Sequence, residues 1–218
     1  MQLIFQDRGE AAKKLAKMLE WLKKEEPIIL AIPRGGVVTG DVIASALGAK
    51  LDVVVPRKLG APYNPELAIG AVMHDGTYFL NTDIIRMLNV PREYIDAEIA
   101  AQMREIERRL LRFRGSKKYD LQGKIVVLVD DGIATGATMF AAAQWVKKQK
   151  AKKLIVAVPV GPIKTIDNLK KVADHVIVVL SPLLFEAVGE FYQDFAQVSD
   201  DEVQEIMTKH GYKIVARQ

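Results

Sequence analysis

Five short apolar runs constrain the fold of this chain more than any other feature of its sequence. Each is rich in valine, isoleucine and leucine, and none shows the apolar–polar alternation of a strand with one solvated face. Such runs are typical of strands that are buried on both faces, as in a parallel sheet. They lie at residues 28–32, 51–55, 125–129, 154–158 and 176–180.

Helical patterns separate these runs. Residues 11–24 have apolar side chains at helical spacing, and residues 37–47 form a second such segment that Gly48 ends. Residues 138–148 carry lysines at their C-terminal end, where the helix dipole favours them. The alternation predicts an α/β fold: a doubly wound, mainly parallel five-stranded sheet flanked by helices, with ligands at the carboxyl ends of its strands.

Three further segments depart from the alternation. Residues 70–81 predict a β-hairpin that turns at Asp75-Gly76, and residues 57–66, rich in glycine, proline and asparagine, predict a loop. Residues 92–114 predict a long amphipathic helix, which could cover the core, form a dimer interface or roof a site; covering the core is the commonest role. A capping box at Ser199 predicts a final helix. We see no second independent domain within residues 1–218.

Composition excludes several classes of site. The chain has no cysteine, so disulfides, thiolate catalysis and cysteine-based zinc sites are excluded, and its three histidines do not favour a histidine-rich metal centre. The composition does not exclude a site that holds a cation through oxygen ligands. No apolar run approaches the ~18 residues of a membrane span, and residues 1–9 lack the pattern of a signal peptide. We therefore expect a cytoplasmic protein without a membrane partner.

The charge balance gives little support for nucleic-acid binding. Lys+Arg number 31 and Asp+Glu 27, a net charge of +4, which is too small an excess to indicate a nucleic-acid partner. Much of the positive charge lies in residues 104–118. A solvated helix face is the favoured interpretation, and a basic collar around a phosphate site is the alternative.

The segment that follows Ile125–Val129 carries the strongest functional signal. Asp130 and Asp131 end a buried strand, and small and hydroxyl residues then lead into a helix. Backbone N–H groups at a helix N-terminus bind anions, and Thr135 and Thr138 add hydroxyl donors. A phosphate would repel the carboxylates, so these should face sugar hydroxyls or a magnesium ion. A phosphorylated sugar fits both halves; the alternative is that the acids cap the helix and the threonines are turn residues.

The sequence Asp-Asp-Gly-Ile-Ala-Thr-Gly-Ala-Thr at residues 130–138 resembles the phosphoribosyl pyrophosphate signature of type I phosphoribosyltransferases. The resemblance implies that the acids contact the ribose hydroxyls and that residues 134–138 hold the 5-phosphate. Members that act on 6-oxopurines carry an aspartate in place of Ala134, so the motif is closer to the adenine-type variant. The implied binding residues are Gly132, Ile133, Ala134, Thr135, Gly136, Ala137 and Thr138. P-loop and dinucleotide-binding glycine motifs are absent from the sequence.

Residues 31–37, Ala-Ile-Pro-Arg-Gly-Gly-Val, follow the first apolar run. Gly35 and Gly36 permit a positive φ or a strained peptide, and Arg34 can hold a phosphate with two hydrogen bonds. The alternative is a tight strand-to-helix turn with a surface arginine. The resemblance makes this segment the pyrophosphate loop and implies a cis peptide between Arg34 and Gly35.

Residues 57–66 are similar to the mobile loop of the family, which closes over the reacting centre together with the hairpin that follows it. The resemblance implies that Arg57 and Lys58 stabilise the departing pyrophosphate. Glu66 is the candidate proton acceptor from the base, with a plain surface residue as an equal alternative.

Residues 181–195 follow the last apolar run. Phe185, Val188 and Tyr192 suit contact with a flat heterocycle, although aromatic residues here could equally be core. Asp194 lies in a stretch that, by resemblance, supplies a ligand to a second magnesium ion, beside Asp130 and Asp131. The N-terminal segment and residues 181–198 would form a small hood.

These features together predict a Mg²⁺-dependent enzyme that transfers the 5-phosphoribosyl group from phosphoribosyl pyrophosphate to a nitrogenous base, with a purine favoured. The chain most resembles a branch known only as predicted phosphoribosyltransferases, for which no acceptor is agreed. Family habit favours a homodimer, and no nucleic-acid partner is expected. A non-catalytic sensor of phosphoribosyl pyrophosphate or nucleotides is the alternative, and a scaffold with a relict site is the least favoured interpretation.

Overall fold

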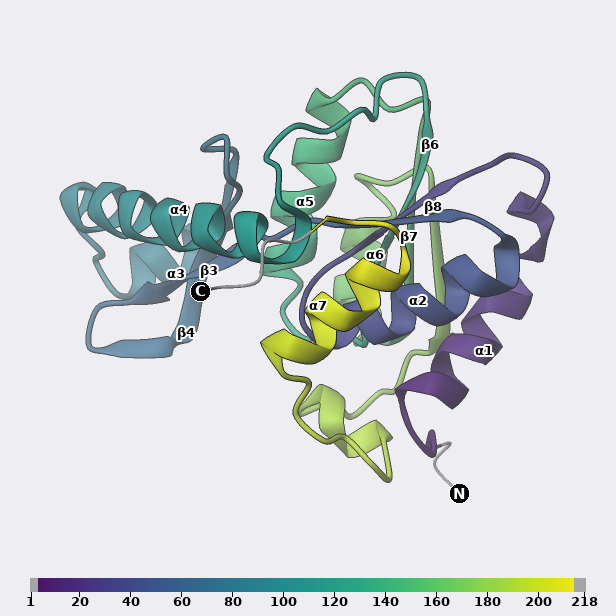
Figure 1. The fold of residues 1–218 in the computed structure, drawn as a ribbon. Helices are drawn as coiled ribbons and strands as arrows, with labels where there is room; N and C mark the ends of the chain where they lie inside the picture. Colours follow the sequence, from purple (N-terminus) through teal and green to yellow (C-terminus); the bar gives the residue numbers. More distant parts are fainter. Residues whose placement is uncertain (1–3, 214–218) are drawn as a thin grey trace.

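The five apolar runs become the strands of one parallel sheet in the computed structural model, which describes residues 4–213 (Figure 1). The strand order is β2-β1-β6-β7-β8, and every neighbouring pair is parallel. The strands are β1 Ile28–Ala31, β2 Lys50–Val53, β6 Ile125–Val129, β7 Lys153–Val160 and β8 His175–Leu180. The fold class predicted from the sequence is therefore confirmed.

Burial differs between the centre and one edge of this sheet. β1 and β6 are buried at every position, as their unbroken apolar runs predict. β8 is only half-buried, so the prediction that all five strands are buried on both faces is wrong for this one. β8 is the last strand of the sheet and pairs with β7 alone, which leaves its outer side uncovered by a further strand.

Helices cover both faces of the parallel sheet. Val127 and Val129 of β6 belong to one core with α1 (Arg8–Met18) and α2 (Gly35–Leu47). Val126 and Leu128 point to a second core with α5 (Ala137–Lys148) and α6 (Ile163–Leu169). The alternation of side chains along the strand thus builds two cores on opposite faces, which is the doubly wound arrangement.

The helix ends follow the capping signals in the sequence. Gly48 has φ 64° and ends α2, as predicted. Ser199 and Glu202 form the predicted capping box of α7 (Asp200–Lys209). The expected helix at residues 11–24 begins earlier, at Arg8, because Asp7 caps it, and continues after Met18 as the short 3₁₀ helix η1 (Glu20–Leu22). Among residues 4–213, no helix combines the length and the apolarity needed to cross a bilayer.

A separate antiparallel sheet, with the order β3-β4-β5, projects from the main body (Figure 1). Its strands are β3 Arg57–Ala61, β4 Asn64–Val72 and β5 Tyr78–Leu80, and the short helix α3 (Thr82–Met87) follows. The predicted hairpin at residues 70–81 is confirmed, with Gly76 at φ 80° in its turn.

The loop predicted at residues 57–66 is wrong, because β3 and the start of β4 form a hairpin there. The register between these strands shifts at Gly60, where a side chain would come within 2.9 Å of the Pro65 backbone. The glycine and proline content therefore permits a closely spaced, irregular strand pair rather than a loop.

The long helix α4 (Arg92–Arg114) has the predicted boundaries and covers a core. Its apolar stripe buries Ile95, Ile106, Leu110 and Phe113 in the same core as residues of β3 and β4. Of the three roles open to it, covering the core is therefore observed.

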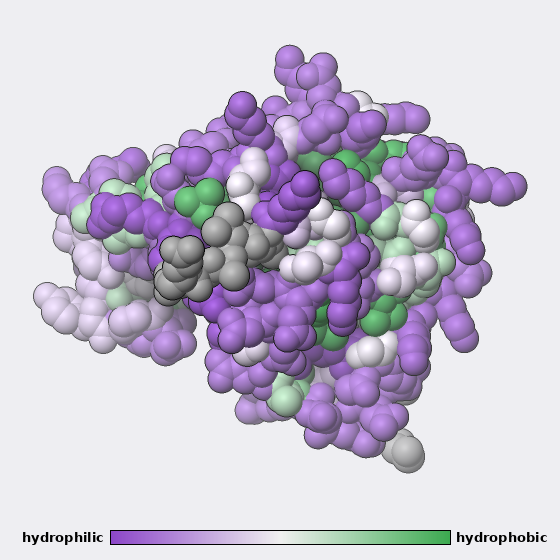
Figure 2. All heavy atoms as spheres, in the orientation of Figure 1, coloured by the Kyte–Doolittle hydropathy of each residue, from purple (hydrophilic) through white to green (hydrophobic). Residues whose placement is uncertain are grey.

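The basic residues near the end of α4 are mostly paired within the chain. Arg108 and Arg109 form ion pairs with Glu105. Their hydrogen bonds lower the pKa of Glu105 to about 2. Arg114 and Asp52 form a buried ion pair with a 2.7 Å contact. The favoured interpretation, a solvated helix face, fits Arg108 but is wrong for the buried Arg114. Hydrophilic side chains also dominate the face of the molecule in Figure 2, where apolar residues form small separate areas.

The N-terminal segment packs against residues 188–195, below the sheet in Figure 1. The Phe5 N–H donates to the Phe191 carbonyl (2.8 Å), and the Gln193 N–H donates to the Phe5 carbonyl (2.8 Å). Phe5 is fully buried beside Phe191, which lies in the 3₁₀ helix η2 (Val188–Phe191), and beside Tyr192. These are the two segments from which a hood was predicted; the role itself stays a prediction.

Candidate functional site

Two loops meet at the carboxyl edge of the parallel sheet, one after β1 and one after β6. The strands are direct neighbours, with Ala31 opposite Val129, and the Ile32 N–H donates to the Val129 carbonyl (2.9 Å). The segment from Pro33 to Gly36 therefore lies against the Asp130-Asp131 pair. This is the edge at which ligands bind in open α/β sheets.

Gly35 and Gly36 are required because the two loops approach each other closely. A side chain on Gly35 would overlap the Asp131 carboxylate, and one on Gly36 would lie 2.8 Å from the Asp130 Cα atom. Neither glycine has a positive φ, so the first of the two expected reasons for glycine is wrong. The cis peptide predicted between Arg34 and Gly35 is also misplaced by one bond, because the cis bond joins Pro33 and Arg34.

Asp130 and Asp131 carry an excess of negative charge. The Asp131 N–H donates to Asp130 Oδ1 (2.9 Å), and both side chains are partly buried. Burial and the charge of Asp131 raise the pKa of Asp130 well above its ordinary value. The two adjacent carboxylates therefore favour a bound cation or hydroxyl groups that donate hydrogen bonds to them.

Arg8 supplies one cation to this pair, and the sequence analysis did not find it. Its Nε donates to Asp131 Oδ2 (2.7 Å), and its Nη1 donates to the Ala196 carbonyl (2.8 Å). The guanidinium lies 3.8 Å from the centre of the Phe195 ring. The first residue of α1 carries no local signal for this contact, because its partner lies 123 positions away.

No side chain caps the start of α5. Gly136, at φ 79°, precedes the helix and provides no side-chain cap. The Ala134 carbonyl accepts from Thr165 Oγ1 (2.9 Å), and the Ile133 N–H donates to the Val160 carbonyl (2.9 Å). These bonds fix the loop, while Ala134 and Thr135 stay exposed.

The first N–H groups of a helix have no partner inside it, so an uncapped start can bind an anion. The start of α2 behind Arg34 likewise has no side-chain cap. The starts of α4 and α6 also lack a side-chain cap, whereas α1, α3 and α7 are capped by Asp7, Asn81 and Ser199. What distinguishes α2 and α5 is that they follow β1 and β6, which are direct neighbours in the sheet.

Residues 185–195 pack against the loop that follows β6. The Tyr192 hydroxyl donates to the Asp131 carbonyl (2.6 Å), and burial raises the pKa of this phenol above its ordinary value. Val188 packs so closely on Gly132 that a side chain at Gly132 would collide with it. Phe185 stacks on Phe191, with 5.2 Å between the ring centres.

Asp194 does not join the acidic pair. It is exposed, and its Oδ1 accepts from the Ala196 N–H (3.0 Å). Across residues 4–213, no three acidic or histidine side chains come together as a metal site.

Arg34 is held near the site by an acid that sequence reasoning also missed. Arg34 Nη1 lies 3.5 Å from Asp200 Oδ1, and about a third of the Arg34 side chain stays exposed. Asp200 also pairs with Arg112 (2.8 Å), which shares the charge of this carboxylate between two arginines. The guanidinium of Arg34 is therefore oriented without being neutralised fully.

Arg57, Lys58 and Glu66 lie on the β3–β4 hairpin. Arg57 Nε donates to Gln102 Oε1 of α4 (2.8 Å). The pKa of Arg57 is lowered mainly by burial and, to a smaller extent, by the nearby charge of Arg109. Lys58 and Glu66 are exposed. No hydrogen bond or ion pair within residues 4–213 joins these three side chains to residues 130–138.

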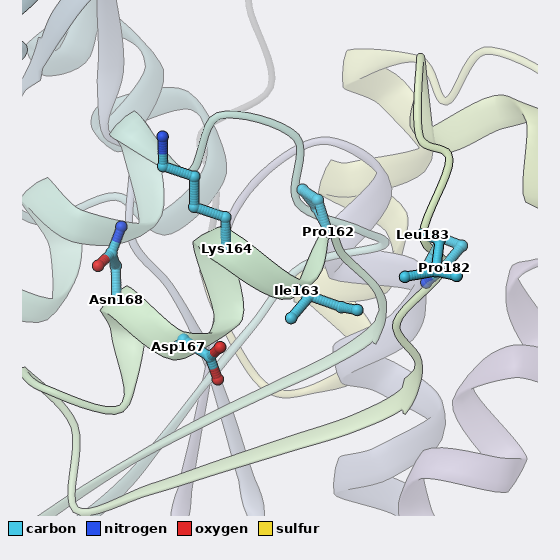
Figure 3. A pocket seen from close by; sticks show the side chains of 7 residues that line it. All are labelled: Pro162, Ile163, Lys164, Asp167, Asn168, Pro182 and Leu183. Carbon is cyan, nitrogen blue, oxygen red and sulfur yellow. The ribbon is translucent and has the colours of Figure 1, made fainter.

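A separate hollow of about 530 Å³ lies beside the start of α6 (Figure 3). Pro162, Ile163 and Lys164 line it from the helix, and Pro182 and Leu183 line it from the segment after β8. No residue from 130 to 138 borders this hollow. We therefore do not assign the ligand site to it.

The residues present fit a magnesium ion bound together with a ligand. Asp130 and Asp131 offer carboxylate oxygens, the ligands that Mg²⁺ prefers, and burial together with the charge of Asp131 raises the pKa of Asp130. Mg²⁺ is usually held by one or two carboxylates together with substrate oxygens, so a third acid such as Asp194 is not needed.

Comparison with known proteins agrees with this geometry. A family model for the phosphoribosyl transferase domain matches residues 2–195. Two proteins of Mycobacterium tuberculosis, from strains CDC 1551 and H37Rv, each carry the name "Putative phosphoribosyl transferase" and are 45% identical over 201 residues, which is 92% of this chain. The chain spans only 45% of the length of these relatives.

A solved structure extends the similarity to the whole fold. The crystal structure of TT1426 from Thermus thermophilus matches with a TM-score of 0.79 at 41% identity, and the match covers 94% of this chain and 98% of that one. The family match runs from the N-terminal helix through both loops to the segment behind them. The chain therefore belongs to the type I phosphoribosyltransferase family, as the sequence of residues 130–138 predicted.

Proposed function

We propose that this protein transfers the 5-phosphoribosyl group from phosphoribosyl pyrophosphate to a nitrogenous base and releases pyrophosphate. One observation carries the proposal: an acidic pair lies at the same sheet edge as two helix starts that have no side-chain cap. Family membership supports the same reaction. Phosphoribosyl pyrophosphate has ribose hydroxyls, a 5-phosphate and a pyrophosphate, and this sheet edge has candidate groups to bind each of them.

The residues divide these tasks. The backbone N–H groups of residues 134–138 would hold the 5-phosphate, with the hydroxyl groups of Thr135 and Thr138 as further donors. Asp130 would accept hydrogen bonds from the ribose hydroxyls. Arg34, at the start of α2, would bind the pyrophosphate.

Bound Mg²⁺ would supply positive charge to the pyrophosphate and so favour its departure. Arg57 and Lys58 would add cations to the leaving group after the β3–β4 hairpin approaches, and Glu66 would accept the proton of the base. This requires Arg57 to leave Gln102, to which it is hydrogen-bonded. Closure of the hairpin would also keep water from the reacting carbon.

The acceptor is proposed to be a purine. Phe185 and Val188 are only partly buried and could contact a flat heterocycle, whereas Tyr192 is buried and engaged with Asp131. Tyr192 would therefore act by supporting the loop. A homodimer and a cytoplasmic location remain predictions from the sequence.

Pyrophosphate release tests the proposal directly. Wild-type protein is incubated with phosphoribosyl pyrophosphate, MgCl₂ and a panel of purine, pyrimidine and other nitrogenous acceptors. Release with one acceptor should fall about 100-fold or more in Asp130→Asn/Asp131→Asn, because the sugar loses its positioning groups. Asp120→Asn, at an exposed acid outside the site, is the matched control and should keep wild-type activity.

A non-catalytic sensor is the second candidate. The hydrogen bond from Arg57 to Gln102 favours it, because it holds a predicted catalytic cation on α4. Calorimetry separates the two functions. Mg²⁺-dependent binding of phosphoribosyl pyrophosphate, with no release across the panel, would favour the sensor over the enzyme.

A further inference from the structure

Arg8 is fixed by contacts from three directions. Its partners are the Asp131 carboxylate, the Ala196 carbonyl and the face of the Phe195 ring. Only 11% of the Arg8 side chain and 14% of the Asp131 side chain are exposed. A guanidinium held this way is a built part of the site rather than a surface ion pair.

The elements on both sides of Arg8 are themselves anchored. Asp7 accepts from the Glu10 N–H (2.8 Å) and so sets the start of α1 at Arg8. Phe5 exchanges backbone hydrogen bonds with the segment that provides Phe195 and Ala196. The arginine and the groups that hold it therefore form one packed unit.

The charges at the site do not balance without Arg8. Asp130 and Asp131 are adjacent, and Arg8 is the one cation within 4.0 Å of either carboxylate among the residues that the structure describes. When both carboxylates are ionised, Arg8 leaves one uncompensated negative charge on the loop, and without Arg8 there would be two. A sugar phosphate that approaches residues 134–138 would meet this charge directly.

We propose that Arg8 is a positioning residue: a resident counter-ion that holds the Asp131 carboxylate and lets the loop accept an anionic sugar phosphate. The two acids then have different tasks. Asp131 is held by Arg8, and Asp130 is left for the ligand. This inference rests on the proposed function, because it assumes that residues 130–138 bind a phosphorylated sugar.

A counter-ion and a merely structural arginine predict different results. Loss of a counter-ion makes the site more negative, so an anionic ligand should bind more weakly and a bare cation more tightly. Loss of a structural contact deforms the loop, so both should bind more weakly. The signs of the two changes therefore decide between them.

The test compares Arg8→Met with Lys14→Met. Lys14 is a cation on the same helix that pairs with Glu10, away from the acidic loop. Calorimetry measures ribose 5-phosphate binding in EDTA and, separately, the binding of MgCl₂ alone. Arg8→Met should bind ribose 5-phosphate about tenfold more weakly, which is about 1.4 kcal/mol, and bind Mg²⁺ more tightly. Lys14→Met should match the wild type in both.

Two further variants separate charge from folding. Arg8→Lys keeps the cation and should recover part of the ribose 5-phosphate affinity. Arg8→Met/Asp131→Asn removes both charges and should bind ribose 5-phosphate more tightly than Arg8→Met does. Melting curves check that each variant is folded. Weaker binding of both probes in Arg8→Met, or no change in either, would overturn the inference. Wild-type protein that binds neither ribose 5-phosphate nor Mg²⁺–phosphoribosyl pyrophosphate would refute the proposed function, and this inference with it.

Discussion

Gly36→Ala offers a sharp test of how closely the two loops approach. The new methyl group would lie 2.8 Å from the Asp130 Cα atom, 2.9 Å from Asp130 Oδ1 and 3.1 Å from the Val129 carbonyl oxygen. Two of these three atoms belong to the backbone of a buried strand end, so no side-chain rotation relieves the contact. The loops after β1 and β6 would have to separate.

The cost follows from two opposing effects. Overpacking of this kind costs about 1–3 kcal/mol. Alanine in place of glycine in the first turn of α2 returns up to about 1 kcal/mol through helix propensity. The net loss lies between about 0 and 3 kcal/mol, and a central value of about 1–2 kcal/mol lowers the melting temperature of a chain of this size by about 2–8 °C. Displacement of Asp130 should weaken ribose 5-phosphate binding about tenfold or more.

Thermal melting and calorimetry measure both effects, with Gly9→Ala as the matched control. Gly9 also lies in the first turn of a helix, and its nearest atom, Asp7 Oδ1, would be 3.1 Å from the new methyl group. This control should change the melting temperature less than Gly36→Ala, because only the Asp7 side chain, which caps α1, has to shift by a few tenths of an ångström. A Gly36→Ala protein with wild-type melting and wild-type affinity would refute the close approach of the loops.

Three further predictions concern the same loop. Asp130→Asn should raise the melting temperature at pH 7.5: the pKa of Asp130 is raised above its ordinary 3.8, so its ionised form destabilises the fold at neutral pH, and the gain should vanish as the pH falls towards 4. A gain that persists at pH 4 would contradict this cause. Tyr192→Phe removes the donor to the Asp131 carbonyl and should cost about 1 kcal/mol in the free energy of unfolding, measured in urea; an unchanged value would show that the bond is not needed. Gly136→Ala, at φ 79°, should cost about 1–2 kcal/mol and weaken ribose 5-phosphate binding, whereas Gly123→Ala, at φ 70° with open space around it, should cost stability alone.

The sequence predicted the parts of the fold that local patterns determine. Unbroken apolar runs such as Ile125–Val129 indicate buried strands without any knowledge of their neighbours. The boundaries of α4 and the capping box at Ser199 are likewise written in residues a few positions apart. The hairpin at residues 57–66 was missed because glycine and proline usually indicate loops, and only strand pairing shows how these residues are used.

The site was predicted only in part, for a related reason. The motif at residues 130–138 is continuous, so its residues could be chosen from the sequence. Arg8 and Asp200 reach the site from opposite ends of the chain, and neither has a neighbouring signal. The need for Gly35 was recognised, but its cause was not, because the atom that excludes a side chain belongs to Asp131.

The central pair of strands also has a consequence for the newly synthesised chain. Ile28 of β1 pairs with Val126 of β6, so β1 has β2 as its sole parallel partner until the ribosome has passed Val129. The nascent chain thus carries an apolar strand with one open edge, a state that favours aggregation. Closing this distant pair brings Asp130 against the first loop, and β7 and β8 are then added beyond β6. During synthesis, the ability to bind ligand should therefore not arise before β6 has left the ribosome and paired with β1.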